Sequence, residues 1–444
     1  MRKKNKASEL QEIDVGPLLK FSTVILLFYT VNQLHFPSSL GLPGVNVLNI
    51  IFFSVYLMHL AQKRPDPLKP YLTARFVIVM AFMVYGFVVA QIRMPLSLME
   101  DITYLKTGLF YPLYFFLAFH LVQSRNDTRF FVVVLMGVAG IAGLEAIREA
   151  LDYGIGNYKE ANRAAGPFGE NFTAANRAGI FYSMFYPLFV AFALFASGYP
   201  KLIRMAAMAG AVVLILAVFF TYSRQSYFIC LLLTGILFMR KNWFMVLVLM
   251  FAMLNYDLWV PNSAIERIEG TQQVNEHGKE EVDESTASRW VLWQGGFAMS
   301  ADMPWGIGLN RFKREIGNYT QYPGKDAHNY YVLIFAETSP LSSLFQIILV
   351  VSLALMGMRL ARAGGKCKDD FAQTFGQAFF VMSLGMILGN VYGSPFFSGE
   401  VMGLYWFAAG MVCRYVTVLD LEVKQLRRER RKRRNAAKGM VARA

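Results

Sequence analysis

His328 stands where a long polar segment meets an apolar run, in the sequence Asp326-Ala-His-Asn-Tyr-Tyr-Val-Leu-Ile-Phe-Ala-Glu337. An imidazole, with an ordinary pKa of about 6.5, is largely neutral near pH 7 and can take a proton from a substrate hydroxyl. Of the five histidines, we expect His328 to be the only one placed where an aqueous loop outside the cytoplasm meets the bilayer. The sequence therefore predicts chemistry at a membrane surface. A substrate-binding or a structural role for His328 stays open.

Four arginines lie in segments that we expect on the same side of the membrane. Arg224 occupies the tight turn between two apolar runs, and Arg289 precedes a tryptophan in a long loop. Arg163 and Arg177 flank a loop that is rich in glycine and asparagine. A guanidinium group pairs bidentately with phosphate oxygens and stays charged at any relevant pH. The pattern favours a phosphate-binding cluster, and snorkelling to lipid headgroups is the alternative for Arg163, Arg177 and Arg224.

The composition excludes a soluble domain of this size. The 444-residue chain is 55% hydrophobic and only 17% charged, and its mean hydropathy is +0.37. A helix needs about 20 apolar residues to cross a hydrocarbon core of about 30 Å. Runs of suitable length predict an all-α polytopic protein with about twelve transmembrane helices. They lie at 18–35, 44–61, 72–92, 107–122, 129–147, 177–197, 203–222, 225–240, 243–260, 329–358, 371–390 and 396–417.

The spans divide the chain into four parts. We expect nine helices in 1–256, a large loop at 257–328, three helices in 329–417 and a basic tail at 418–444. Alternate loops hold most of the 44 Lys and Arg residues, so the positive-inside rule places both termini in the cytoplasm. The large loop then lies outside. No internal repeat is visible, which argues against a transporter built from repeated halves.

The large loop has two kinds of sequence. Residues 266–284 are strongly acidic and are expected to be solvated, with a cation site at 280–284 as the alternative. From Ser285 an N-cap and a helical pattern predict a short interfacial helix that ends before Pro304. Its aromatic stripe consists of Trp290, Trp293 and Phe297.

The remaining charge and cysteine content does not indicate nucleic-acid or cysteine-based metal binding. The formal charge of +14 is concentrated partly in 427–434, directly after the last span, where a topology anchor near anionic headgroups is expected. The three cysteines support neither a disulfide framework nor a metal site. The first loop expected outside the cytoplasm, Phe36-Pro-Ser-Ser-Leu-Gly-Leu-Pro43, contains no acidic residue.

Four motifs, taken in order, resemble the O-antigen ligase and polymerase superfamily. They are Gly166-Pro-Phe-Gly-Glu-Asn171 with Asn176, Thr221-Tyr-Ser-Arg224, Ser288-Arg289-Trp290 with Pro304-Trp-Gly306-Ile-Gly308-Leu-Asn-Arg-Phe312, and Ala327-His328-Asn329 through Glu337. The motifs cover about 165–345, and the topology covers the whole chain. One departure is Thr338-Ser-Pro340, where relatives usually carry glycine.

The resemblance implies a GT-C-like glycosyltransferase of the bacterial inner membrane, with its active site in the periplasm. It would move a glycan from undecaprenyl diphosphate to a lipid A core hydroxyl, in lipopolysaccharide biosynthesis, without a cofactor. Other lipid-linked glycosyltransferases that rely on divalent ions carry carboxylates in their first loop outside the cytoplasm. Since the corresponding loop at 36–43 has none, we predict that the protein uses no metal. His328 would be the base, and Arg224 and Arg289 would stabilise the departing diphosphate. The expected substrate-binding residues are Arg163, Asn176, Arg177, Arg311 and Asn329. Lys313, Arg314 and Lys325 could join Arg311 in binding acceptor phosphates.

Several alternatives remain. The protein could instead polymerise lipid-linked O-antigen or exopolysaccharide repeat units, with a second lipid-linked glycan as acceptor. From another class, a lipid-linked glycan flippase or exporter would need basic residues along a path through the membrane rather than at one face. Glu337, nine positions after His328, could have either a structural or a catalytic part.

Overall fold

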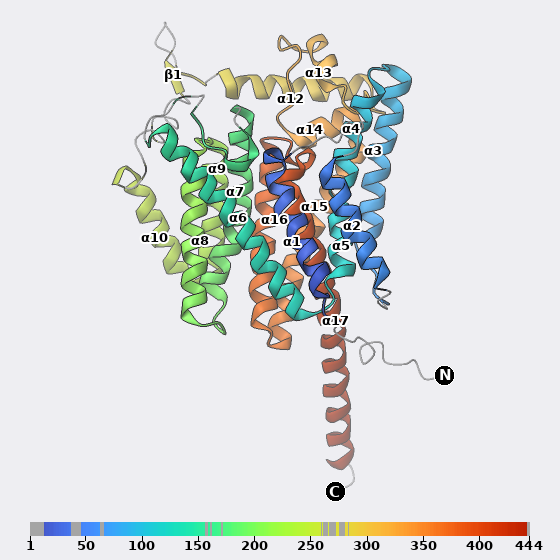
Figure 1. Ribbon diagram of the computed structural model, residues 1–444, viewed down its shortest axis with the longest axis vertical. Coiled ribbons are helices and arrows are strands. Elements are labelled where there is room, and N and C mark those ends of the chain that lie inside the picture. Colours follow the sequence, from blue (N-terminus) through green and yellow to red (C-terminus); the bar gives the residue numbers. More distant parts are fainter. Residues whose placement is uncertain are drawn as a thin grey trace.

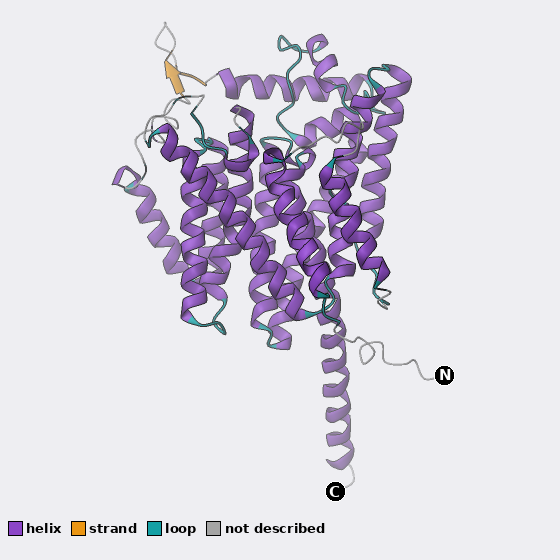
Figure 2. Ribbon diagram, viewed as in Figure 1, coloured by secondary structure: helices purple, strands orange, loops and turns teal. Residues whose placement is uncertain are grey.

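The computed structural model describes residues 13–36, 46–62, 66–155, 159, 162–169, 172–258, 260, 265, 272–274, 280–282 and 284–441. The architecture is helical, as predicted, apart from a small hairpin that the sequence did not indicate (Figure 2). In this hairpin β1 (Gln272–Val274) pairs antiparallel with β2 (Glu280–Val282). Much of the acidic segment at 266–284, with part of its alternative cation site, lies outside the described residues.

The helices follow one another closely along the chain. The first half contains α1 (Pro17–Asn32), α2 (Val47–Ala61), α3 (Thr73–Arg93), α4 (Leu98–Phe110), α5 (Leu113–Leu121), α6 (Arg125–Tyr153), α7 (Phe172–Phe195) and α8 (Lys201–Phe220). The second half contains α9 (Arg224–Lys241), α10 (Trp243–Leu254), α12 (Glu284–Asp302), α13 (Phe312–Glu315), α14 (Tyr330–Glu337), α15 (Pro340–Cys367), α16 (Asp370–Val391) and α17 (Gly399–Val441). Short 3-10 turns include η1 (Gln33–His35), η2 (Gly166–Phe168) and η5 (Pro395–Phe397).

Seven helices within the described residues are long and apolar enough to cross a membrane. They are α3, α6, α7, α8, α15, α16 and α17. Shorter apolar helices are α2 and α10. The chain is therefore a multi-pass membrane protein, and the predicted count of twelve spans stays a prediction.

Two predicted spans are not continuous helices. The run at 107–122 is divided between α4 and α5 just before Leu113, at Pro112, which has no N–H to donate. The run at 329–358 is divided between α14 and α15, because Ser339 precedes Pro340 and adopts an extended backbone. The second break produces a short helix, α14, directly after His328.

The centre of the bundle is formed by α7, α16 and α17. In their apolar segments, 89%, 72% and 89% of the residues are buried. Small residues allow α15 to approach α16 closely. A Cβ atom at Gly357 would lie 2.6 Å from Phe380 N, and one at Gly376 would lie 2.3 Å from Ala361 N. This rigid centre supports the loops at its ends.

The two ends of the bundle differ (Figure 1). At one end, here called the site end, α12 lies across the bundle, with α13 and α14 near it. Leu292 and Met299 of α12 belong to a small apolar cluster with Phe312 and Val332. The start of α1 and the end of α17 lie at the opposite end, here called the tail end, where α17 projects beyond the other helices. The basic run at 427–434 lies on this projecting part, and α17 is continuous across the expected boundary at 417–418.

Candidate functional site

His328 is held at the site end by a turn that begins with a contact to α12. The indole Nε1 of Trp293 donates to the carbonyl oxygen of Ala327 at 2.9 Å. The N–H of His328 donates to Oδ1 of Asp326 at 3.2 Å, and His328 adopts a left-handed φ of 48°. A non-glycine residue rarely adopts this conformation, and such strain is frequent at functional sites. The imidazole is exposed.

Asn329 has a structural task that the sequence did not indicate. Its side-chain oxygen accepts hydrogen bonds from the N–H groups of Tyr331 and Val332, at 2.9 and 3.2 Å. These two hydrogen bonds make Asn329, which is buried, the N-cap of α14. Its amide oxygen is therefore engaged by the backbone next to His328, and the substrate-binding role expected for Asn329 stays a prediction.

Positive charges from three segments surround His328. Arg289 comes from α12, Lys313 from α13, and Lys325 from the loop before the histidine. The pKa of His328 lies below its ordinary value, chiefly because nearby protein atoms partly desolvate the imidazole. The three cations act in the same direction, and Asp326 opposes them. The imidazole is therefore kept in its neutral form, which can accept a proton.

Lys313 is also fixed by a partner. Its Nζ atom lies 3.2 Å from Oδ2 of Asp326. Asp326 thus contacts both the His328 N–H and the Lys313 ammonium. The structure therefore brings Arg289, Lys313 and Lys325 near His328, although the sequence analysis assigned the two lysines to a separate group with Arg311.

A second polar cluster surrounds the turn that carries Arg224. Arg163 is only 5% exposed, and its Nε donates to the carbonyl oxygen of Thr221 at 2.8 Å. Its Nη2 donates to Oδ1 of Asn176 at 2.7 Å. Tyr222, inside the turn, has a left-handed φ of 48°. Arg163 and Asn176 therefore hold the turn, and Arg224 follows it as the first residue of α9.

Arg177 connects three elements at the same end. Its Nη1 lies 2.8 Å from Oε1 of Glu400 in α17, and its Nη2 donates to the carbonyl oxygen of Phe168 at 3.5 Å. Gln33 of η1 also donates to Glu400, at 3.4 Å. The side chain of Arg177 remains one third exposed. Arg177 is thus partly available to a substrate while it ties α7 to η2 and α17.

The two clusters are linked through η5. The N–H of Tyr330, two residues after His328, donates to the carbonyl oxygen of Gly393 at 2.9 Å. The ring of Tyr330 lies 4.7 Å from Phe396, measured between centroids. Glu400, the partner of Arg177, follows a few residues later. A continuous path of contacts therefore joins the His328 turn to the Arg177 side of the bundle.

Arg311 does not fit the substrate-binding role expected for it. Its side chain is fully buried, and its Nη1 and Nη2 donate to the two carboxylate oxygens of Asp101, at 2.7 and 2.5 Å. Its Nε donates to the carbonyl oxygen of Met94 at 2.9 Å. The pair fastens the segment after Gly308 to α4. We therefore leave Arg311 out of the candidate site.

Glu337 is also buried, at the end of α14. Its Oε1 accepts a hydrogen bond from the N–H of Phe312 at 3.0 Å. Burial raises the pKa of Glu337 to about 7. The carboxyl group therefore joins α14 to α13 beneath the His328 turn, which favours a structural part for it.

The sequence argument missed one side-chain contact at the site end. Nε2 of His35 in η1 lies 2.7 Å from Oε1 of Glu145 in α6. Leu34 contacts the loop at Gly169, so His35 lies near the Arg177 cluster. His328 is therefore not the only described histidine at this end, and the expectation that it alone lies where an outside loop meets the bilayer stays a prediction. The position of His35 directly after the first apolar run was the available signal.

Within the described part of the chain, no group of three or more His, Cys, Asp or Glu residues is arranged to hold a metal ion. The predicted independence from metals remains a prediction.

Fold and site define a multi-pass helical membrane protein with a basic, histidine-containing site at one end. Residues 209–338 match the family described as O-Antigen ligase. The match confirms the resemblance to the O-antigen ligase and polymerase superfamily and spans Arg224, Arg289 and His328. It indicates ligase-type or polymerase-type activity on lipid-linked glycans. No curated protein matches the chain.

Proposed function

We propose that the protein is an O-antigen ligase-type glycosyltransferase of the bacterial inner membrane. It moves a polysaccharide from undecaprenyl diphosphate to a hydroxyl of the lipid A core, with inversion and without a metal. The site end faces the periplasm, and both termini lie in the cytoplasm. The observation that carries this proposal is the exposed, cation-surrounded His328 within the segment that matches the ligase family.

The transfer step needs one base and one anion-binding group. A ring nitrogen of neutral His328 takes the proton of the acceptor hydroxyl while the hydroxyl oxygen bonds to the anomeric carbon of the donor glycan. The bond from that carbon to the diphosphate oxygen breaks, and the electron pair leaves with the diphosphate. Because the attack is a direct displacement, it inverts the anomeric configuration. The proton later returns to solvent from the imidazolium.

The arginines stabilise the leaving diphosphate. Arg289 lies close enough to His328 to affect its charge state. Arg224 follows the turn that Arg163 holds through Thr221, and Arg177 is partly exposed. These two arginines bind the diphosphate from the α7 and α9 side. Negative charge grows on the departing oxygen, so fixed guanidinium groups stabilise the transition state more than the ground state. Arg163 and Asn176 position the Arg224 turn.

The ligase proposal is tested with purified protein in nanodiscs. Donor alone should remain unchanged until lipid A core is added, and the product should then carry the glycan. A ladder of longer lipid-linked chains without any core would instead establish the polymerase alternative.

The flippase alternative predicts a different result. In sealed proteoliposomes it would move the intact lipid-linked glycan between leaflets without breaking the bond to the diphosphate. The candidate arginines gather at the site end rather than along a path through the bundle, which favours transfer.

A further inference from the structure

Glu149 is an acidic residue in the last turns of α6 that the proposed transfer step does not use. The helix has 29 residues, a length of roughly 44 Å, and its last turns reach the site end (Figure 1). A carboxylate on a membrane-spanning helix is costly unless it has partners. The contacts of Glu149, which is half-buried, therefore indicate its task.

Both carboxylate oxygens of Glu149 accept hydrogen bonds. Its Oε2 accepts from the backbone N–H groups of Ala165 and Gly166, at 2.8 and 2.7 Å. Its Oε1 accepts from the hydroxyl of Tyr153, one turn further along α6, at 2.9 Å. Ala165 is fully buried, so loss of the carboxylate would leave its N–H without an acceptor from solvent. Glu149 therefore fastens the loop at 163–166 to α6.

This loop fits closely between α6 and α7. Gly166 has a left-handed φ of 58°, and a Cβ atom there would lie 2.9 Å from the carbonyl oxygen of Ala142 in α6. The hydroxyl of Tyr182 in α7 donates to the carbonyl oxygen of Ala165 at 3.2 Å. The peptide groups of Ala165 are thus held by Glu149 on one side and by α7 on the other.

The same loop holds the end of α8. The N–H of Ala164 donates to the carbonyl oxygen of Phe220, the last residue of α8, at 3.1 Å. The adjacent Arg163 donates from Nε to the carbonyl oxygen of Thr221 at 2.8 Å. The last carbonyl groups of a helix lack partners within the helix, so these contacts fix where α8 ends. A shift of the loop would therefore move the turn that leads to Arg224.

We propose that Glu149 is a positioning residue for the donor diphosphate, which acts through the 163–166 loop and the turn before Arg224. This inference rests on the proposed function, in which Arg224 binds the diphosphate. Glu149 does not touch the substrate. It fixes the loop, the loop fixes the turn, and the turn sets where the guanidinium group meets the diphosphate oxygens. A bidentate contact depends on geometry, so a small displacement of the turn weakens it.

The test measures binding of undecaprenyl diphosphate to purified variants in nanodiscs. Glu149→Ala should weaken binding by about tenfold or more, because hydrogen bonds to a charged group are worth at least that factor. Glu149→Gln should restore most of the affinity, since its amide oxygen can still accept from the loop. Glu149→Asp keeps the charge but is one methylene group shorter, so it should also weaken binding.

The direction of the effect distinguishes positioning from simple electrostatics. Removing a negative charge near a diphosphate would by itself tighten binding, whereas loss of positioning weakens it. Tighter or unchanged binding by Glu149→Ala would therefore overturn the proposal. Affinity that follows the charge, with Glu149→Asp normal and Glu149→Gln altered, would overturn it as well.

A double-mutant cycle identifies the residue through which Glu149 acts. In an Arg224→Ala background, Glu149→Ala should change binding by less than about twofold, because the positioned residue is gone. In an Arg289→Ala background the full loss should remain. An equal loss in both backgrounds would contradict the proposed route.

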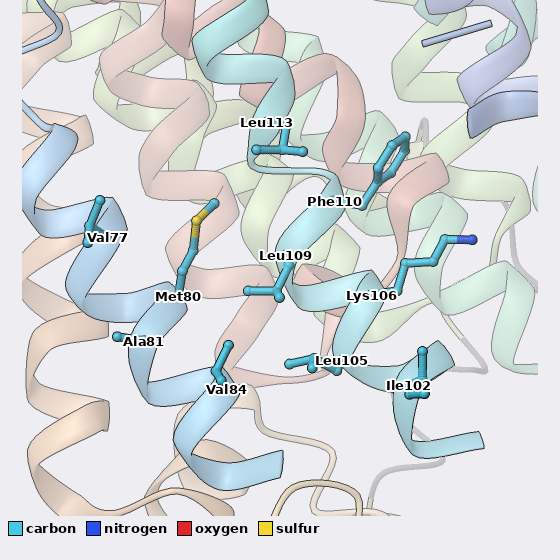
Figure 3. Close-up of a pocket in the computed structure, with 10 residues that line it drawn as sticks. All are labelled: Val77, Met80, Ala81, Val84, Ile102, Leu105, Lys106, Leu109, Phe110 and Leu113. Atoms are coloured by element: carbon cyan, nitrogen blue, oxygen red, sulfur yellow. The ribbon is translucent and has the colours of Figure 1, made fainter. Parts of the chain in front are cut away.

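Two controls separate positioning from a general loss of stability. Asp152→Ala removes an exposed acid from the same end of α6 and should leave binding unchanged. Phe110→Leu reduces a buried ring in the wall of the apolar groove between α3 and α4 (Figure 3), so it should lower the Tm without weakening binding. If Phe110→Leu weakens binding as much as Glu149→Ala at a similar Tm, the positioning role is wrong.

Amide hydrogen exchange gives a second readout, on Glu149→Asp, which serves if the alanine variant does not insert. Residues 220–224 should exchange faster than in the wild type, and residues 306–312 should not. Unchanged exchange at 220–224 would overturn the proposal. If the wild-type protein binds no undecaprenyl diphosphate, the proposed function fails and this inference with it. Normal binding by the wild type and by every Glu149 variant overturns this inference alone.

Discussion

At the scale of single residues, the charge state of His328 is set by its neighbours. Desolvation and the three nearby cations Arg289, Lys313 and Lys325 all disfavour the imidazolium. Asp326 limits this effect and also holds the backbone of the turn. His328 is therefore neutral over a wider range of pH than an ordinary histidine, as the proposed base must be.

His328→Ala should lower kcat by about 10²- to 10⁴-fold, because the acceptor hydroxyl loses its base. Arg224→Lys and Arg289→Lys should also be severely impaired, since an ammonium cannot replace a bidentate guanidinium. Transfer is measured with purified variants, and Arg359→Lys at the tail end is the control. Near-normal transfer by all three site variants, with normal membrane insertion, would contradict the mechanism.

Lys325→Gln should move the acidic limb of the profile of kcat/KM against pH to higher pH. The neutral imidazole is the active form, so activity falls as the pH drops through the pKa of His328. Removing the Lys325 charge removes repulsion of the imidazolium and raises that pKa. Lys366→Gln, an exposed change at the tail end, should leave the profile unmoved. An unshifted limb in Lys325→Gln would show that another group is titrating.

At the scale of elements, the segment between α12 and α13 is held by close backbone contacts. The N–H of Ile307 donates to Ala336 O at 3.0 Å, and that of Gly308 donates to Glu337 O at 2.9 Å. This segment carries Arg311, whose buried pair with Asp101 fastens it to α4. The short helix α14 is therefore fixed from both ends, by the Asn329 cap and by these contacts.

Gly308→Ala should destabilise the protein more than Gly324→Ala. Both glycines have a left-handed φ, which costs an alanine about 1–2 kcal/mol. At Gly308 a Cβ atom would also lie 2.6 Å from Ala90 Cα, whereas nothing lies within 4 Å at Gly324. Thermal unfolding in detergent should show the larger drop in Tm for Gly308→Ala. Equal drops would mean that α3 shifts to accommodate the methyl group.

The acidic segment before α12 provides the prediction on metals. Activity of the purified protein should survive an excess of chelator, because charge stabilisation is assigned to arginines. Loss of activity with chelator, followed by rescue with Mg²⁺ or Mn²⁺, would direct attention to residues 280–284 as the alternative cation site.

At the scale of the whole molecule, the two ends have separate tasks. The site end carries α12, α13 and α14, and the tail end carries the start of α1 and the projecting part of α17 (Figure 1). The loop between Cys367 and Asp370 and the C-terminus lie at the same end. The proposed function requires the site end to lie outside the cytoplasm.

A reporter fused after residue 275 should be active only outside the cytoplasm. Reporters fused at 365 and at 440 should be active only inside, because the Lys and Arg residues near these positions favour the cytoplasmic side of the membrane. The measurement pairs a reporter that works in the periplasm with one that works in the cytoplasm at each position. A cytoplasmic signal at 275 would separate the site from its substrates and contradict the proposed function.

The sequence by itself determined the features that depend on neighbouring residues. Apolar runs located most of the helices, because a run of about 20 consecutive apolar residues can be recognised from the local sequence alone. The helical pattern after Ser285 predicted α12, which ends at Asp302 as the following Pro304 indicated. The motif order indicated the family, and the positions of Arg289 and His328 indicated one neighbourhood.

Only the tertiary structure decided which polar groups are paired. Arg311 and Asp101 are 210 positions apart, and Arg177 and Glu400 are 223 positions apart. Hydrogen bonds of this kind depend on how helices pack, which local sequence does not encode. For this reason the sequence did not indicate the partners of Arg311 and Asn329, or the contact between His35 and Glu145. Helix packing pairs Arg311 with Asp101, places Asn329 at the start of α14, and brings His35 to the site end.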